Sequence, residues 1–169
     1  MTSKLKVNLI NDSGDNNIIT SDGSGVITSS KFKIGQIQSA TFTDNLSTSS
    51  TSFVASTITD SITPTSTSSK ILVLINGGRS SFSGGEAEGS SQLYYQVGSG
   101  SFTSITDIMK ANNNQSGSFG GVTLSFNFLH SPSSTSALTY KVYFKTSANT
   151  YFLNSDTSAV NITLMEVLP

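Results

Sequence analysis

The last third of the chain alternates strictly between apolar and polar residues. Val122, Leu124, Phe126 and Phe128 alternate with Thr, Ser and Asn, and the same period recurs over residues 138–145 and 160–165. Successive side chains of a strand point to opposite faces, so this period predicts strands with one core face and one wetter face. Further strands are predicted at 32–42, 53–62, 70–76, 91–98 and 101–105.

Polar segments separate these predicted strands. Gly77-Gly78 is expected to end one strand, and polar loops are expected at 43–52, 79–90 and 107–120, with a single helical turn at 106–111. Gly98-Ser99-Gly100 predicts a tight turn and a hairpin. The pattern indicates an all-β, antiparallel, jelly-roll-type β-sandwich of two four-stranded sheets. An immunoglobulin-like sandwich is disfavoured because the chain has no Cys–Trp–Cys signature.

The composition supports a β-protein and excludes several functional classes. The chain has 34 Ser and 21 Thr, whereas charged residues make up 11%, against about 25% in ordinary domains. Its net charge of −1, without a block of like charge, gives no electrostatic footprint for nucleic acid. With no cysteine it has no disulfide framework and no thiolate metal site. No apolar run is long enough to span a membrane and no signal peptide is evident, so synthesis in a cytoplasm is expected.

The first 31 residues differ from the rest of the chain. Residues 4–10 alternate like a strand, and short extended pieces follow between two turn clusters, but apolar residues are too few for a core. We therefore interpret residues 1–31 as an extended N-terminal arm that needs a partner, and residues 32–169 as a sandwich knob. The apolar residues of the arm that we predict at an interface are Val7, Leu9, Ile18, Ile19 and Val26.

The chain has few residues that could form a catalytic site, and we expect that it is not an enzyme and binds no cofactor or metal. His130 is the single histidine, and it lies where a strand ends. Glu86 and Glu88 lie in a glycine-rich segment that cannot hold two carboxylates rigidly across a sugar. The oxygen-rich stretch at 11–15 lacks the spacing of a calcium loop and is better explained as a turn.

The positions of two residues in the strand alternation suggest functional interpretations for them. Glu166 is an even number of residues from Ile162 and Leu164 on the same predicted strand. Its side chain should therefore point to the same side as theirs, toward the core or a subunit interface. A buried carboxylate needs a partner, which we expect to be a lysine, an arginine or backbone amides, unless the strand end is simply exposed. Tyr143 has the outward parity, which suits either a glycan-binding tyrosine or an interface.

Several sequence blocks resemble a known family. Ile34-Gly-Gln-Ile-Gln, the stretch from Ile62-Thr-Pro to Ser-Ser-Lys-Ile-Leu-Val73, and Ile162-Thr-Leu-Met-Glu-Val167 resemble small virion proteins of marine and cyanobacterial tailed phages. The resemblance covers about residues 32–168, and the N-terminal segment is similar to the piece that precedes the domain in phage fibre proteins. It implies a structural protein on the virion surface, with no functional site to carry over.

Two roles remain open from the sequence. The first is a capsid decoration or head-fibre knob that is attached through the arm to a capsid or tail protein, and the length of the chain, which leaves no shaft, favours it. The second is a tail-fibre tip that recognises host surface glycan. Either role suits a homotrimer, as in many viral jelly rolls. The candidate ligand contacts are Tyr143, Arg79, Glu86 and Glu88.

Overall fold

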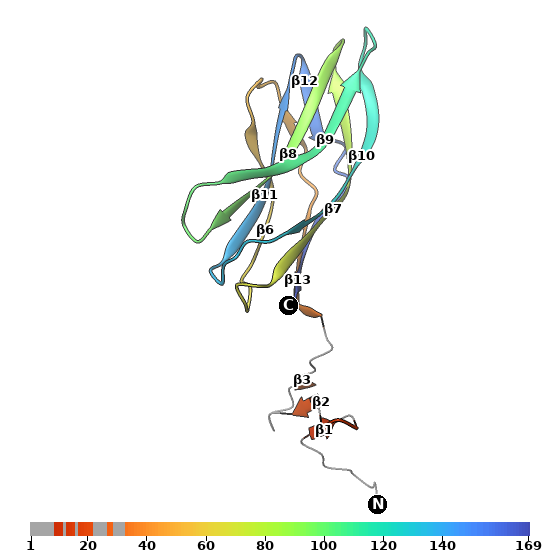
Figure 1. The fold of residues 1–169 in the computed structure, drawn as a ribbon. Coiled ribbons are helices and arrows are strands. Elements are labelled where there is room, and N and C mark those ends of the chain that lie inside the picture. The colour runs from red at the N-terminus through yellow and green to blue at the C-terminus, as the bar shows by residue number, and fades with distance from the viewer. Residues whose placement is uncertain (1–8, 12, 16, 22–26, 29–32) are drawn as a thin grey trace, which may run out of the picture.

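The computed structural model describes residues 9–11, 13–15, 17–21, 27–28 and 33–169, and within them every regular element is a β-strand. The strands fall into three antiparallel sheets (Figure 1). Their bounds are β1 Leu9–Asn11, β2 Asn17–Ser21, β3 Ile27–Thr28, β4 Ile34–Phe42, β5 Leu46–Thr48, β6 Val54–Ile62, β7 Lys70–Ser83, β8 Ala87–Val97, β9 Thr103–Asn113, β10 Phe119–His130, β11 Leu138–Thr146, β12 Thr150–Asn154 and β13 Val160–Val167.

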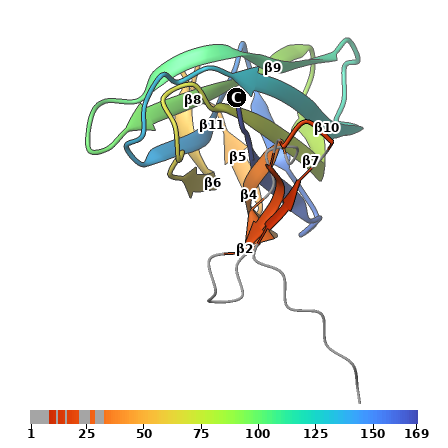
Figure 2. The same cartoon turned by 60° about the horizontal axis from the view of Figure 1, so that its bottom comes forward.

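Two of the sheets pack face to face as a jelly-roll-type sandwich, which confirms the predicted fold class. One sheet has the order β4-β13-β7-β12-β5, with β10 on the other edge of β7, and the second has the order β6-β11-β8-β9. In Figure 2 the layer with β8, β9 and β11 lies above the layer with β4, β5 and β7. The sheets therefore have six and four strands, where the sequence predicted four and four.

The core lies between the inner faces, as the alternation predicted. In β11 every second residue is buried, and in β13 Val160, Ile162, Leu164 and Glu166 are buried in turn. The largest fully buried apolar side chains come from both sheets and include Ile75, Leu93, Tyr140 and Tyr151. Because each strand places one residue in two inward, the outer faces remain available for other contacts.

Two segments that were predicted as loops, 79–90 and 107–120, are mostly strands, and a third, 43–52, contains the short strand β5. The segment 79–90 belongs to the long strands β7 and β8, residues 107–113 continue β9, and Leu46 is buried in β5. The helical turn expected at 106–111 is wrong for the same reason. The pairing of β8 with β9 shifts register twice, and bulges of this kind break the two-residue alternation that identifies a strand in the sequence.

Gly77-Gly78 also proved to have a different role from the one expected. The two glycines do not end the strand but lie within β7, with φ of 107° and 71°. A Cβ on Gly77 would lie 2.2 Å from the carbonyl oxygen of Ala159. At this point β7 stops pairing with β13 and, further on, pairs with β12. The glycines therefore allow one long strand to change its neighbour.

In its described part the N-terminal segment pairs with itself. Strands β1, β2 and β3 form a small antiparallel sheet, with Ile10 opposite Ile19 and Thr20 opposite Thr28. The sandwich begins where this segment ends, and its start is fixed to the chain end. The Leu168 N–H donates to the Lys33 carbonyl at 2.7 Å, and the Lys33 ammonium donates to the Pro169 carbonyl at 2.5 Å.

Candidate functional site

Glu166 is fully buried at this end of the sandwich, and of the partners predicted for it the structure shows a backbone amide, joined by two neutral side chains in place of a lysine or an arginine. Its Oε1 accepts hydrogen bonds from the Thr65 N–H at 2.6 Å and the Thr65 hydroxyl at 2.8 Å, and its Oε2 accepts one from Gln36 Nε2 at 2.9 Å. Burial by itself raises the pKa of Glu166, but the hydrogen bonds from Gln36 and Thr65 outweigh it, so the pKa lies below its ordinary value.

The carboxylate joins three segments that are distant in the sequence. Gln36 belongs to β4, Thr65 to the link between β6 and β7, and Glu166 to β13. Gln36 also donates to the Thr63 carbonyl at 2.5 Å, and a Cβ on Gly35 would lie 2.9 Å from Oε2 of Glu166. Glu166 is therefore a structural connector at the end where the N-terminal segment enters, and within this chain its partners are backbone and neutral side chains.

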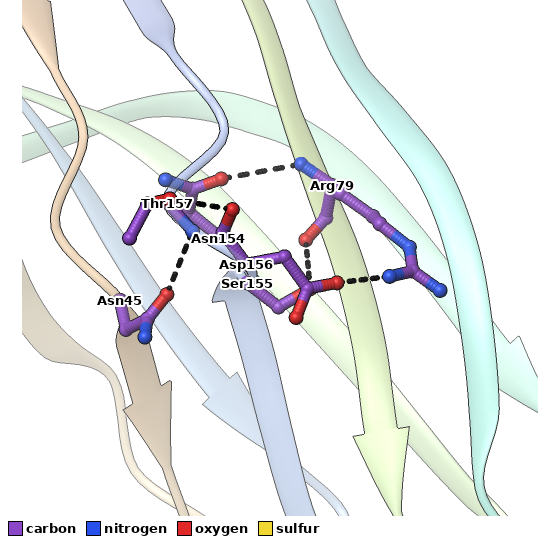
Figure 3. Close-up of polar contacts among 6 residues, drawn as sticks. All are labelled: Asn45, Arg79, Asn154, Ser155, Asp156 and Thr157. Atoms are coloured by element: carbon purple, nitrogen blue, oxygen red, sulfur yellow. Dashed lines mark hydrogen bonds and ion pairs between the residues drawn. The ribbon is translucent and has the colours of Figure 1, made fainter.

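Arg79, a predicted ligand contact, is held in a polar cluster around the turn between β12 and β13 (Figure 3). Its guanidinium pairs with Asp156, its N–H donates to Oδ1 of Asn154 at 3.2 Å, and its carbonyl accepts from the Ser155 hydroxyl at 3.0 Å. Asn154 is fully buried and also donates to the carbonyls of Asp44 and Ser158. The contacts of Arg79 thus tie β7 to a turn.

That turn is strained. Asp156 and Thr157 have φ of 60° and 54°, and the Ser158 N–H donates to the Ser155 carbonyl at 3.3 Å. Positive φ at both central residues is the mark of a type I′ turn, which favours glycine or asparagine and disfavours a β-branched residue. The Thr157 N–H donates to Oδ1 of Asn45 at 3.1 Å, which helps to hold the conformation.

The two glutamates of the predicted loop do not meet Arg79. Glu86 is exposed in the short connection between β7 and β8, and Glu88 lies in β8, where it pairs with Lys110 at 3.4 Å and accepts from the Ser90 hydroxyl at 3.2 Å. The pair of Glu88 with Lys110 is an ordinary surface ion pair. The structure therefore does not bring the predicted contacts Arg79, Glu86 and Glu88 together with Tyr143.

His130 is part of an aromatic cluster rather than a hydrolytic one. Its Nδ1 lies 2.8 Å from the Tyr140 hydroxyl, and its ring is 4.5 Å from the ring of Tyr95, edge to face. Burial lowers the pKa of His130, and burial beside Tyr95 raises that of Tyr140. Over the described residues, no group of three or more His, Asp or Glu side chains is arranged to hold a metal ion.

Tyr143 lies on the outer face of the four-stranded sheet, as its parity predicted, within a row of four rings. Its ring is 4.1 Å from that of Tyr94 and 5.9 Å from that of Phe102, and Tyr94 is 6.4 Å from Phe53. All four side chains are partly exposed. We call Phe53, Tyr94, Phe102 and Tyr143 the aromatic array.

A lysine lies over each end of the aromatic array. Lys145 Nζ is 4.7 Å from the centroid of Phe53, and Lys141 Nζ is 5.2 Å from that of Phe102. Neither lysine pairs with a carboxylate of the described chain. Beside the array, Gln92 accepts from the Tyr94 hydroxyl at 3.3 Å and donates to Asp107 at 2.5 Å. The face therefore combines ring surfaces with polar groups, as binding surfaces do.

The opposite outer face carries an apolar patch that sequence reasoning missed. Strand register places Ile37, Met165, Leu72 and Leu129 in one row across β4, β13, β7 and β10. Ile37 is 55% exposed and Leu129 is 46% exposed. Neighbouring residues on this face extend the row. The apolar patch consists of Ile34, Ile37, Leu72, Leu74, Leu129, Met165 and Val167.

The same face becomes polar away from the N-terminal segment. Thr41 donates to Asn161 at 2.6 Å, and Ser125 donates to Asn76 at 3.1 Å, both across neighbouring strands. These cross-strand hydrogen bonds among Ser, Thr and Asn side chains form a polar border of the apolar patch. An exposed apolar patch with a polar border is typical of a protein-contact surface.

The arm residues predicted at an interface are only partly described. Leu9 in β1 is 43% exposed, and Ile19 in β2 is half-buried. The backbone of Ile18 lies in β2. Val7 and Val26 lie outside the described residues. Their place at an interface therefore stays a prediction, which the exposure of Leu9 suits.

No protein-family model matches the chain, and no curated protein matches it in sequence. Among solved structures, it is similar to infectious bursal disease virus Gt strain, with a TM-score of 0.43 and 11% identity over 86% of this chain and 45% of that chain. It is also similar to a mutant VP2 protein of the same virus in derived T=1 particles, with a TM-score of 0.41, 10% identity and coverage of 86% and 43%. This chain thus spans less than half the length of those proteins. No helix among the described residues is long and apolar enough to cross a membrane.

Proposed function

We propose that this chain is a structural protein of a virion, a capsid decoration or head-fibre knob that attaches through residues 1–31 and works as a homotrimer. The sequence blocks that resemble phage virion proteins support the class. The apolar patch carries the proposal, because it gives the knob a surface for assembly next to the point where the N-terminal segment joins it. Ile34 of the patch directly follows Lys33, the first described residue of the sandwich.

The occupant that we assign to the apolar patch is a second copy of this chain. A face of aliphatic side chains bordered by polar residues matches the composition of homomeric contacts, which are more apolar than the rest of a surface. By strand register, the charged residue at the border of the patch is Lys70, opposite Val167, and its long side chain can keep the ammonium in solvent when copies approach. Residues 1–31 would then leave each subunit beside the contact and reach the capsid or tail protein together.

The test is the mass of the purified chain in solution, by light scattering coupled to size exclusion. We expect about three times 17.7 kDa at micromolar concentration. Leu129→Glu, within the patch, should give a monomer that still melts cooperatively. Ser125→Glu places the same charge on the same face of β10, opposite Asn76 in the polar part of the face, and should leave the trimer intact. A stable wild-type monomer contradicts the proposal.

A second candidate function is favoured by the aromatic array on the opposite face. Partly exposed tyrosine and phenylalanine rings beside amide and carboxylate groups suit the recognition of sugar rings, which present apolar C–H faces and polar hydroxyls. On this alternative the knob is a tail-fibre tip that recognises host surface glycan. The two candidate functions use different faces of the knob. Binding assays with the isolated chain test glycan recognition, and the mass in solution tests assembly.

A further inference from the structure

The aromatic array has a charge pattern that narrows the class of ligand. We infer that the outer face of the β6-β11-β8-β9 sheet binds an anionic polysaccharide, a chain of pyranose sugars that carry carboxylate or sulfate groups. This inference rests on the second candidate function and deepens it, because it names the chemistry of the glycan.

The geometry of the face suits a polymer better than a single sugar. The four rings follow one another from Phe53, just before β6, to Phe102, just before β9, and Tyr94 and Tyr143 stand between them. Lys145 and Lys141 lie at the two ends, both on β11 and both on its outer face. An extended row of rings can contact successive sugars, whereas a monosaccharide would use only one or two of the rings.

The two lysines supply the preference for negative charge. Each ammonium lies over a ring and none of the described carboxylates pairs with it, so its remaining hydrogen-bond donors are free to face a ligand. Asp107 lies on the same face, but its Oδ1 is engaged by the Gln92 amide at 2.5 Å. The array therefore presents a lysine without a carboxylate partner at each end, and the Asp107 carboxylate beside it is held by an amide.

Single-stranded nucleic acid also combines rings with negative charge, but the face suits it less well. Binding of that kind depends on a groove with many cationic side chains that neutralise successive phosphates. Among the described residues two lysines lie over the rings, Lys110 on the same face pairs with Glu88, and the whole chain has a net charge of −1. A sparsely charged polysaccharide matches two cations separated by rings better than a phosphate on every unit does.

The experiment is affinity electrophoresis or calorimetry of the purified full chain with two uronate polymers, hyaluronate, which carries a carboxylate on every second sugar, and polygalacturonate, which carries one on every sugar. Neutral dextran and a thymidine oligonucleotide are tested in parallel. We expect binding to the uronate polymers that weakens with added salt, and weaker binding to dextran. Tyr143→Ala should reduce the affinity by at least about tenfold, as the loss of a central aromatic contact does. Lys141→Gln and Lys145→Gln should each reduce it by about fivefold, the factor of one exposed ion pair.

A matched control is Lys70→Gln, which removes an exposed lysine of the opposite sheet and should leave the affinity for the polysaccharides unchanged. The lysine variants keep the test decisive if Tyr143→Ala fails to fold, since their ammonium groups are not in the core. Equal affinity for dextran overturns the anionic class but leaves glycan recognition standing. Tighter binding to the oligonucleotide overturns the inference in favour of nucleic acid. No binding to any polysaccharide overturns both this inference and the glycan candidate, and leaves the assembly proposal to its own test.

Discussion

Replacing Glu166 with glutamine tests whether the buried carboxylate is a connector of the sandwich. The amide nitrogen would have to face either the Thr65 donors or the Gln36 amide, so at least one of the three hydrogen bonds becomes a contact between two donors. Hydrogen bonds to a charged group contribute about 1.5–3 kcal/mol. We therefore expect Glu166→Gln to lower the free energy of unfolding by about 2 kcal/mol, or the melting temperature by about 4–8 °C for a chain of this size.

The same substitution has a pH signature. The pKa of Glu166 is lower in the folded chain than its ordinary value of 4.5, because the hydrogen bonds favour the ionised form over the opposing effect of burial. The contribution of this group is therefore fully present above about pH 4.5 and is lost as the pH falls through the lower folded pKa. The gap in stability between wild type and Glu166→Gln should narrow on acidification within this window.

Urea unfolding followed by circular dichroism, at pH 7 and at steps down to pH 3, measures both effects. The control is Glu88→Gln, which removes a partly exposed glutamate whose pair with Lys110 is weak. It should change the free energy by less than about 1 kcal/mol. If Glu166→Gln is as stable as wild type at pH 7, or if the gap widens in acid, the reasoning about this carboxylate is refuted.

Three further changes test the account of the fold by thermal or urea unfolding. Thr157→Gly should stabilise the chain by about 1 kcal/mol, because glycine adopts the positive φ without strain, and a loss of stability would contradict the turn assignment. Gly89→Ala should destabilise by about 1–3 kcal/mol, because the new Cβ would lie 2.5 Å from the Tyr151 ring, and a neutral result would contradict that packing. Wild type should lose stability as the pH falls through about 6.5, because burial lowers the pKa of His130, and His130→Gln should lose less. An unchanged pH profile in that variant would contradict the role of the histidine.

The alternation of residues was sufficient to predict most of the sandwich. Strands with a clean period, such as β11 and β13, lie where the sequence placed them, and their inward residues form the core. The prediction failed where strands contain bulges or glycines. The pair Gly77-Gly78 predicts a strand end, because glycine pairs are typical of turns, but the two positive φ values belong to a long strand that changes its neighbour.

The features of the candidate sites were also predictable only in part. The alternation along single strands predicted an outward position for Tyr143, which the structure shows. For Glu166 it left the core, a subunit interface and an exposed strand end open, and the structure places the side chain in the interior of the chain. The array around Tyr143 was not predictable, because Phe53 and Phe102 lie just outside strands and are distant in the sequence. The apolar patch was not predictable either, because its row forms only through the register of four strands, which the sequence does not reveal.

The most direct measurement of the proposed virion role is quantitative mass spectrometry of purified particles that are produced with this chain and, in parallel, with a chain that lacks residues 1–31. We expect the full chain to copurify with the particles at a copy number that matches the capsid lattice, and the truncated chain to be absent from them. A copy number that matches only the few tail fibres would favour the receptor-binding alternative. Absence of the full chain from the particles would contradict the central claim.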